Sequence, residues 1–440
     1  MAALDVLKTL QSEVGSRRDG TPGASRAREW LAAQCQGMGL PVEMDEFTFV
    51  SSERYRPLLQ MVFVSLIVVG FILSFSGQPL LGGASLFLAF FLFFNLRKTL
   101  EIRLARTPSQ NVIAGLKRPI SHYVAEENKG PAVLLCAHYD TPRNMPPWAE
   151  KLRGGFRFLG PLALLGILLY VLSLILLAFG WLLDVAGWDG LLIFARSVNP
   201  WIGGLTLLLA APLLLLMFFS SLSTLLRKKT DSPGADDNGS GTALVVELAR
   251  RFKENPPKNL ELFFAWWGAE EYGLFGSRQF VRRFHDQLDK DLFYVVNADC
   301  VGVGELLAVH SGQGTLSRRQ TDPVTLERVE RVAGQLGVKT IRTWESIISG
   351  GSSDHAEWVN RGYRQAISIL RENYRPISLP ARIFAALLRI PDANQLDIGH
   401  IHTPADTIEA IRPQILEETA ALAEAYVRDI DQEWGEVASH

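Results

Sequence analysis

The chain has 440 residues, a formal net charge of −2 at neutral pH and 48% hydrophobic residues. That length exceeds what one small core requires and allows two or more structural units. The charge is nearly balanced, and basic residues cluster only beside apolar segments, so we expect no nucleic-acid partner.

The N-terminal region is predicted to form helices followed by a strand. Apolar residues recur at helical spacing through residues 5–40, with interruptions at Gly15 and at Gly20–Gly23, and residues 42–50 alternate as a strand does. The chain does not open with a basic segment followed by an apolar run, so we expect no secretory signal peptide. Membrane insertion would therefore depend on internal segments.

Four apolar runs without charged residues follow in two pairs, and turn-forming residues separate the first two. Each run is about long enough for a membrane-spanning helix, so we predict a multi-pass integral membrane protein with four helices in two hairpins. Buried core helices, or a re-entrant first pair, are the alternatives. The runs are residues 58–75, 80–96, 158–183 and 201–222.

Basic residues flank the ends of both hairpins, whereas the first turn is uncharged and residues 184–200 contain two aspartates and one arginine. The positive-inside rule then places both hairpin openings, and the domain attached to them, on the cytosolic side. The three cysteines are odd in number and widely spaced, so no disulfide framework is expected. The flanking residues are Arg54, Arg56, Arg97, Lys98, Arg103 and Arg106, then Lys151, Arg153, Arg157, Arg227, Lys228 and Lys229.

The remaining sequence alternates predicted strands (110–116, 132–137, 260–267 and 293–297) with helices (242–252, 272–284 and 324–336). This alternation predicts an α/β fold: a mostly parallel mixed sheet with helices on both faces. In such sheets the active site lies beyond the carboxyl ends of the strands. The expected organisation is one domain in three parts, residues 1–57, 97–157 and 223–440, interrupted by hairpins at 58–96 and 158–222.

Acids and histidines gather in five clusters, each at a predicted strand end or in the adjoining loop. One cluster alone would be explained by a surface turn, a helix cap or a solvated face, but five together indicate a site. Two histidines and three acids suffice for a pair of zinc ions that share one carboxylate. A further acid is needed to move protons. The clusters are Cys136–Thr141, Pro233–Gly241, Ala269–Gly273, Asn297–Asp299 and His400–Thr407.

In this order the clusters resemble those of the co-catalytic two-zinc aminopeptidases, whose relatives include glutamate carboxypeptidase, glutaminyl cyclase and the catalytically silent transferrin receptor. The resemblance covers nearly all the chain except the apolar insertions, and it includes Gly15–Arg17 and Gly20–Gly23. It implies a zinc aminopeptidase-like fold, two zinc ions as cofactors and a peptide as substrate.

The resemblance also implies the metal ligands. One zinc ion would have His138 and Asp299 as terminal ligands. The other would have Glu271 and His402. Asp237 would bridge the two ions, because the family's bridging acid is the fourth residue of a Gly-Ala-x-Asp turn, which favours it over Asp236.

Other residues would act beside the ligands. Glu270 would be the general base, and Asp140 would fix the tautomer of His138 through its other ring nitrogen. The segment Ser353-Asp354-His355 matches a family segment near the substrate. Asp354 and His355 are therefore candidate substrate contacts, with a structural role equally open for His355. His400 matches no ligand position.

The implied function is a membrane-anchored zinc exopeptidase, an aminopeptidase in the first instance. A glutaminyl cyclase, a carboxypeptidase and a non-catalytic membrane receptor or scaffold are the alternatives. Manganese or cobalt could occupy the same ligands, and the oligomeric state is left open. Because the second hairpin lies between Asp140 and Asp237, the membrane is expected to lie close to the catalytic mouth. Residues 376–392 carry an apolar helical stripe typical of an interfacial helix, a lid or a core helix.

Overall fold

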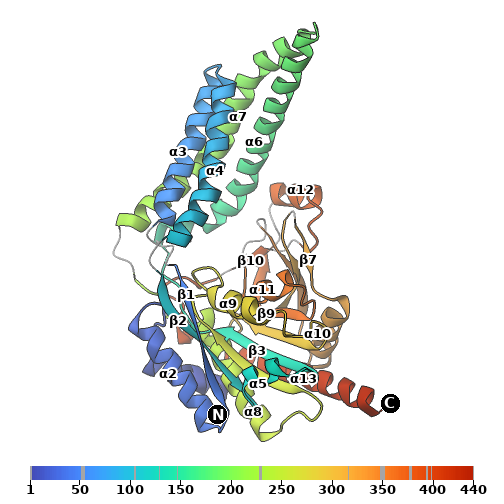
Figure 1. Ribbon diagram of the computed structural model, residues 1–440. Helices are drawn as coiled ribbons and strands as arrows, with labels where there is room; N and C mark the ends of the chain where they lie inside the picture. Colours follow the sequence, from blue (N-terminus) through green and yellow to red (C-terminus); the bar gives the residue numbers. More distant parts are fainter. Residues whose placement is uncertain are drawn as a thin grey trace.

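A computed structural model describes residues 2–439 apart from 51–54, 104–105, 128, 146, 227–229, 316, 347–351, 376–378, 393–394 and 398. The described residues form a ten-stranded mixed sheet covered by helices, and four long helices project from one end of this sheet domain (Figure 1). The two termini lie at the other end, away from the projecting helices.

The centre of the sheet is parallel and its flanks are antiparallel. Strands β4, β3, β5 and β9 run parallel in that order, β1 and β2 add antiparallel strands on one side, and β9 pairs antiparallel with β6 on the other. This mixed sheet confirms the predicted fold class. The strands are β1 (Val42–Phe49), β2 (Thr107–Gly115), β3 (Ala132–His138), β4 (Glu261–Trp267), β5 (Phe293–Ala298), β6 (Leu306–Gln313), β7 (Arg319–Gln320), β8 (Thr340–Glu345), β9 (Ala366–Arg375) and β10 (Gln395–Asp397).

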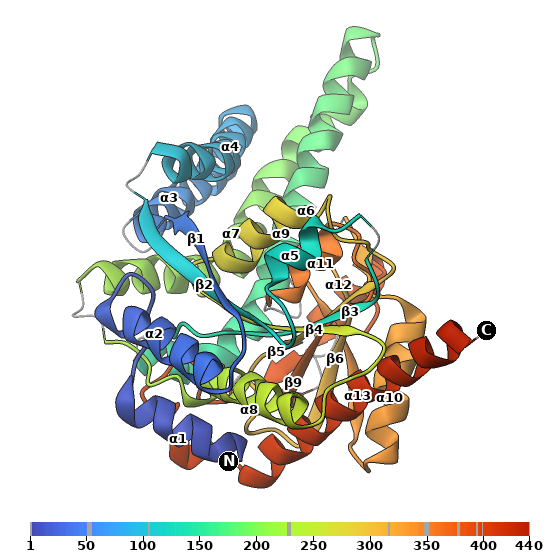
Figure 2. The same ribbon diagram turned by 60° about the horizontal axis from the view of Figure 1, so that its bottom comes forward.

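Both faces of the sheet are covered by helices, because alternate residues of the central strands point to opposite sides. In β3, Val133 and Leu135 belong to one apolar core, and Leu134 and Cys136 belong to the other. Figure 2 shows the two helical layers. The first core packs against α1 (Ala3–Glu13), α2 (Pro22–Gly37), α8 (Gly241–Glu254), α10 (Pro323–Gln335) and α13 (Pro413–Ser439), and the second against α5 (Ile120–Ala125), α9 (Phe275–Phe284) and α11 (His355–Asn360).

The helix predicted over residues 272–284 begins later, at Phe275. Ala269 and Leu274 have positive φ angles of 52° and 58°, which a right-handed helix cannot contain. The residues between them therefore form a turn after β4. This turn carries Glu270 and Glu271 to the carboxyl end of the sheet.

The apolar runs form the projecting helices α3 (Arg56–Phe75), α4 (Pro79–Arg103), α6 (Pro147–Val185) and α7 (Gly190–Leu226). Among the described residues, three segments are long and apolar enough to cross a membrane: Arg56–Phe75, Leu165–Val185 and Gly190–Leu226. The apolar part of α4, Pro79–Phe93, is shorter. Within an 18-residue apolar window of each long segment only 22–33% of the residues are buried, so these are not core helices of the sheet domain.

Helix α12 (Leu379–Leu387) lies at the end of the sheet domain that faces the projecting helices, and it contacts α6 (Figure 1). Leu379, Ile383 and Leu387 fall on one helical stripe and are 70%, 53% and 65% exposed. Ala385 of the same helix and the following Ile390 are buried with Trp344 in a small apolar cluster. Helix α12 therefore packs on the domain by one side and exposes the other, which agrees with the interfacial and lid interpretations better than with a core helix.

Candidate metal centre

The acids and histidines of the five clusters meet at the carboxyl ends of the parallel strands. His138 is the last residue of β3, Asp299 follows β5, and Glu271 lies in the turn after β4. Asp237 lies in a short turn, Ala235–Ser240, just before α8, and His402 lies in the loop that precedes the short helix η2 (Ile408–Ala410). This is the edge at which open α/β sheets bind their ligands.

The side chains form two groups that share Asp237. His138 Nε2 lies 3.4 Å from Asp237 Oδ1 and 3.5 Å from Asp299 Oδ1. His402 Nε2 lies 3.0 Å from the other oxygen, Asp237 Oδ2, and 3.8 Å from Glu271 Oε2. Each group of three can place one ligand atom per residue within 4.8 Å of the others. One carboxylate thus presents an oxygen to each group, the arrangement that a bridging ligand requires.

The electrostatics of the centre also fit bound cations. Burial, followed by the charge of Asp237, raises the pKa of Glu271 well above its usual value, and burial does the same for Glu270. Glu271 Oε1 is buried and finds no hydrogen-bond partner among the described residues. Imidazole and carboxylate donors are those that zinc prefers, and a cation would offset the crowded negative charge.

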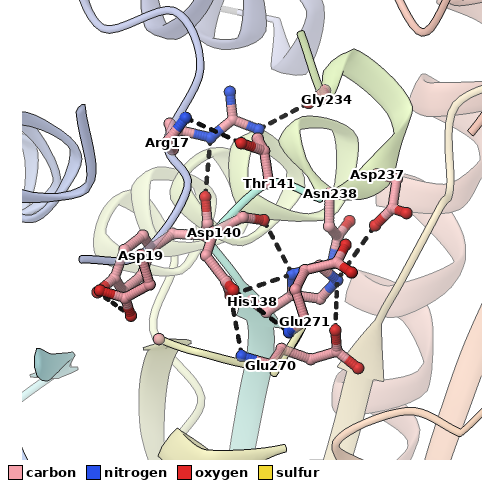
Figure 3. A network of polar contacts seen from close by, with 12 residues as sticks. Arg17, Asp19, His138, Asp140, Thr141, Gly234, Asp237, Asn238, Glu270 and Glu271 are labelled. Atoms are coloured by element: carbon pink, nitrogen blue, oxygen red, sulfur yellow. Dashed lines mark hydrogen bonds and ion pairs between the residues drawn. The ribbon is translucent and has the colours of Figure 1, made fainter. Parts of the chain in front are cut away.

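Glu270 lies beside the first group without belonging to it. Its Oε2 is 3.9 Å from His138 Nε2, and it is not part of either set of three ligand atoms found in the described chain. Figure 3 shows Glu270 and the adjacent Glu271 next to the His138 ring. Both side chains are 12% exposed, and His402 is the most open of the group at 33%. The centre therefore opens towards solvent on the side of His402.

Asp140 makes the predicted contact with His138 and two further contacts that the sequence did not predict. As expected, it faces the second ring nitrogen of His138: Nδ1 lies 3.5 Å from Asp140 Oδ1 and 3.1 Å from its backbone oxygen. The same carboxylate also accepts hydrogen bonds from the backbone N–H groups of Glu270 and Glu271, at 3.1 and 3.3 Å. Asp140 thus ties the end of β3 to the turn that carries both glutamates.

Asp406 holds the turn that contains the shared aspartate, a contact that sequence reasoning missed. Its carboxylate accepts hydrogen bonds from the backbone N–H groups of Asp236 and Asp237, at 2.7 and 3.2 Å. Asp236 itself accepts a hydrogen bond of 2.8 Å from the Gly302 N–H and belongs to neither ligand group. The position of Asp406 within the His400–Thr407 cluster was the available signal.

Arg17 is the other contact that sequence reasoning missed. It is fully buried and donates to the backbone oxygens of Tyr139 and Gly234, at 2.8 and 2.6 Å (Figure 3). It therefore joins the loop after β3 to the loop before α8. Its place in the Gly15–Arg17 segment was a signal of importance, but nothing in the sequence indicated which loops it joins.

The two candidate substrate contacts are fully buried. Asp354 accepts a hydrogen bond from the Ser277 hydroxyl, and the His355 ring stacks on His310 with ring centroids 5.0 Å apart. Burial lowers the pKa of both histidines, to about 4 for His310, and raises the pKa of neighbouring Glu345 to about 8. These surroundings favour the structural role for His355. His400 lies outside both ligand groups.

Residues 219–427 match the model of peptidase family M28. Among curated proteins, an aminopeptidase of Bacillus subtilis (strain 168), YwaD, is 30% identical over 196 residues, which are 44% of this chain and 37% of that protein. The chain spans less than half the length of the curated relatives it matches. The matched family segment includes Asp237, Glu271, Asp299 and His402, whereas His138 lies before it.

Solved structures support the same fold across the chain. A zinc aminopeptidase from Bacillus subtilis aligns with a TM-score of 0.50 at 16% identity, covering 97% of this chain and 94% of that one. A Bacteroides thetaiotaomicron glutaminyl cyclase aligns with a TM-score of 0.51 at 14% identity, covering 97% and 96%. Likenesses at such identities show the fold and leave the reaction to be argued from the site.

Proposed function

We propose that this chain, whose residues 219–427 match the model of peptidase family M28, is a membrane-anchored zinc exopeptidase that removes N-terminal residues from peptides. The observation that carries the proposal is the pair of ligand groups that share Asp237, with one carboxylate oxygen facing each histidine. The Bacillus subtilis relative is named an aminopeptidase, which supports cleavage from the N-terminal end of the peptide.

The proposed centre holds two zinc ions. His138 and Asp299 are the terminal ligands of one ion, Glu271 and His402 are those of the other, and Asp237 bridges them. When bound, such a pair supplies a water of lowered pKa and polarises the scissile carbonyl. Asp140 keeps the ring of His138 oriented through Nδ1.

Glu270 is the proposed general base. It stands next to the ligand turn but is left out of both ligand groups, so its carboxylate is free to move a proton. It accepts the proton of the attacking water and delivers it to the leaving amine. The hydrogen bond from its backbone N–H to Asp140 fixes the start of the side chain relative to His138.

The four projecting helices are the proposed membrane anchor, with the sheet domain on the cytosolic side. Two observations support the anchor: the three long apolar segments and the exposed apolar stripe of α12 on the same end of the domain. The assignment of the sheet domain to the cytosolic side is based on the basic residues that flank the hairpins. A catalytic mouth near the bilayer would favour membrane-tethered peptides, and equal cleavage of tethered and soluble versions of one peptide would contradict this preference.

A glutaminyl cyclase is the second candidate, favoured by the fold likeness to the Bacteroides enzyme. Such an enzyme requires one zinc ion, whereas this chain keeps two complete ligand groups and an adjacent carboxylate. The two functions differ in product, because the cyclase closes an N-terminal glutamine without breaking a peptide bond.

The decisive test is elemental analysis of the detergent-purified protein, combined with assays on aminoacyl substrates and on a glutamine-initiated peptide. We expect two zinc ions per chain and aminoacyl hydrolysis that is lost on chelation. One zinc ion with cyclisation would favour the cyclase. A protein with neither metal nor turnover would contradict both enzymes and favour a binding role.

A further inference from the structure

An arginine-rich pocket of about 610 Å³ lies on the sheet domain, and none of its lining residues belongs to the candidate metal centre. Its volume is within the range of small-ligand sites, roughly 300–1,000 Å³. Strand β7, the end of α11 and the turn that leads to β9 form its walls. Of the described residues that line this arginine pocket, four are arginines (Arg318, Arg319, Arg361 and Arg364) and none is acidic.

Two of these arginines are held by groups without negative charge. Arg318 donates hydrogen bonds to the backbone oxygens of Leu388 and Arg389, just after α12. Arg361 Nη1 lies 2.7 Å from His285 Nε2. Because a guanidinium group can only donate, this ring nitrogen accepts the hydrogen bond. Neither contact brings an anion into the arginine pocket.

The other two arginines contact a single acid between them. Arg364 Nη2 lies 3.7 Å from Asp322 Oδ1, and the Arg364 side chain is 60% exposed. Arg319 is exposed, and its side chain makes no hydrogen bond or ion pair with another residue of the described chain. Its charge is therefore available to a ligand from solution or from a membrane.

The immediate surroundings add one further charge of each sign. Lys290 Nζ lies 3.6 Å from the position that a β-carbon on Gly362 would take, so its ammonium adjoins the wall. Asp286 Oδ1 lies 2.7 Å from His285 Nδ1, and the opposite ring nitrogen faces Arg361. The arginines and the lysine outnumber the acids that contact this region, and the arginine pocket keeps a positive charge.

The arginine pocket adjoins α12, the helix that faces the projecting helices. Figure 1 shows β7 between α12 and the body of the sheet domain, and the contacts of Arg318 join the two segments directly. The exposed apolar stripe of α12 and the arginine pocket are thus neighbours on one surface. Apolar side chains beside cationic ones are typical of protein segments that bind the surface of an anionic bilayer.

We propose that the arginine pocket binds the phosphate of an anionic phospholipid headgroup at the membrane surface next to α12. The inference rests on the proposed membrane anchor and on charge. Guanidinium groups bind phosphate oxygens through paired, charge-assisted hydrogen bonds. The leaflet on the cytosolic side carries the anionic lipids, and the basic residues beside the hairpins assign the sheet domain to that side.

The order of the strands gives this second attachment a function. The first hairpin leaves the sheet between β1 and β2, at one edge, whereas β7 lies at the opposite end of the strand order. The candidate metal centre lies at the ends of β3, β4 and β5, between these two edges. A headgroup bound at β7 would therefore fix the tilt of the sheet domain and hold its catalytic mouth towards the bilayer.

The first test measures binding of dioctanoyl phosphatidylglycerol, a soluble anionic lipid, to the full chain in a non-ionic detergent by calorimetry. Dioctanoyl phosphatidylcholine and inorganic phosphate are the comparison ligands. We expect tighter binding of the anionic lipid than of either, and weaker binding as salt is added. Equal affinity for the two lipids would overturn the proposal. Inorganic phosphate that binds as tightly as phosphatidylglycerol would assign the pocket to a free phosphate instead.

The variants Arg319→Gln and Arg364→Gln locate the binding site. Each removes one guanidinium group from an exposed position, and the dissociation constant for phosphatidylglycerol should rise about fivefold in each. Arg331→Gln, at an exposed arginine on α10 paired with Asp429, removes the same charge elsewhere and should bind as the wild type does. An unchanged constant in both pocket variants, or an equal rise in the control, would overturn the site.

Reconstitution of the full chain in nanodiscs distinguishes failure of the arginine pocket from failure of the membrane anchor. The native cysteines are buried, so a fluorophore can be attached at Gln320→Cys in the pocket wall. A headgroup spin label should quench it more in discs that contain phosphatidylglycerol than in phosphatidylcholine discs. Equal quenching in a protein retained by the discs overturns the pocket alone. A chain that does not enter the discs refutes the anchor, and calorimetry then decides headgroup binding by itself.

Discussion

Ser353 donates a hydrogen bond of 2.6 Å to Asp299 Oδ2, the carboxylate oxygen that does not face His138. Ser353 also accepts a hydrogen bond of 2.6 Å from the Asn297 side chain, so the serine hydroxyl is itself fixed. Partners of this kind orient a ligand and tune its affinity for metal. Ser353 is therefore a positioning residue for the first ligand group.

Replacing this serine by alanine frees one oxygen of Asp299. We expect Ser353→Ala to weaken binding of the first metal ion by roughly tenfold to a hundredfold, as measured by competition with a chelator. Ser311→Ala is the matched control, because this buried serine contacts Thr343 and Asp392 instead. Unchanged metal affinity in Ser353→Ala would show that Asp299 needs no such support.

Glu270→Gln is expected to remove turnover and keep the metal. The amide preserves the size of the side chain but cannot accept the proton, so kcat should fall by about a hundredfold or more. Elemental analysis should still find the wild-type metal content. Loss of both ions from this variant would mean that Glu270 is a ligand. Glu305→Gln, a change at an exposed glutamate, is the control.

Asp237→Ala, in contrast to Glu270→Gln, should lose bound metal. Because both ligand groups share this one carboxylate, its removal takes a ligand from each ion at once, and metal content should fall for both. Asp236→Ala tests the neighbouring acid, which bonds to Gly302 and not to the ligand groups. If Asp236→Ala emptied the centre while Asp237→Ala retained its ions, the assignment of the bridge would be reversed.

We expect the free energy of unfolding to decrease at acidic pH because of His310. Burial lowers the pKa of this histidine to about 4. Below about pH 6.5 the unfolded chain binds a proton at this histidine and the folded chain does not, so the histidine's contribution to stability is lost as pH falls towards 4. The slope is about 1.4 kcal/mol per pH unit. Between pH 7.5 and pH 5 the thermal midpoint of the wild type should therefore drop further than that of His310→Gln.

A control at exposed His122 completes this comparison. The raised pKa of Glu345, about 8, acts in the opposite direction over the same pH range, and Glu345 Oε1 lies 3.3 Å from His310 Nε2. Because residues in contact are not independent, the comparison is repeated in the Glu345→Gln background, where the difference made by His310→Gln isolates the histidine. His122→Gln should follow the wild type. Parallel pH profiles for wild type and His310→Gln would show that His310 has the same pKa in the folded and the unfolded chain.

Helix α12 is expected to touch the bilayer. The three native cysteines are buried, so a cysteine introduced at exposed Ile383 can carry a polarity-sensitive fluorophore with little background labelling. In vesicles the emission of Ile383→Cys should shift to the blue and be quenched by lipid-borne spin labels. Val437→Cys, exposed near the C-terminus, is the control and should do neither. Identical spectra at the two positions would mean that α12 does not enter the bilayer and would favour its interpretation as a lid that is exposed to water.

The alternation of strands and helices, the apolar runs and the order of the five acidic and histidine clusters could all be read from the sequence. Period-two and helical patterns are local properties, and each cluster follows its own strand, so the mixed sheet and the edge that carries the site were predictable. The late start of α9 was not. It depends on the positive φ angles of Ala269 and Leu274, which a pattern of residue types does not reveal.

The tertiary structure decided which groups face one another. Asp236 and Asp237 are adjacent in the chain, and contacts with the distant Asp406 and Gly302 orient them differently. In the same way, only folding brings Arg56 to the Tyr272 backbone across 216 positions of sequence and sets the projecting hairpins against the candidate metal centre. Composition and spacing determine local structure, whereas the direction of a side chain depends on partners far away along the chain.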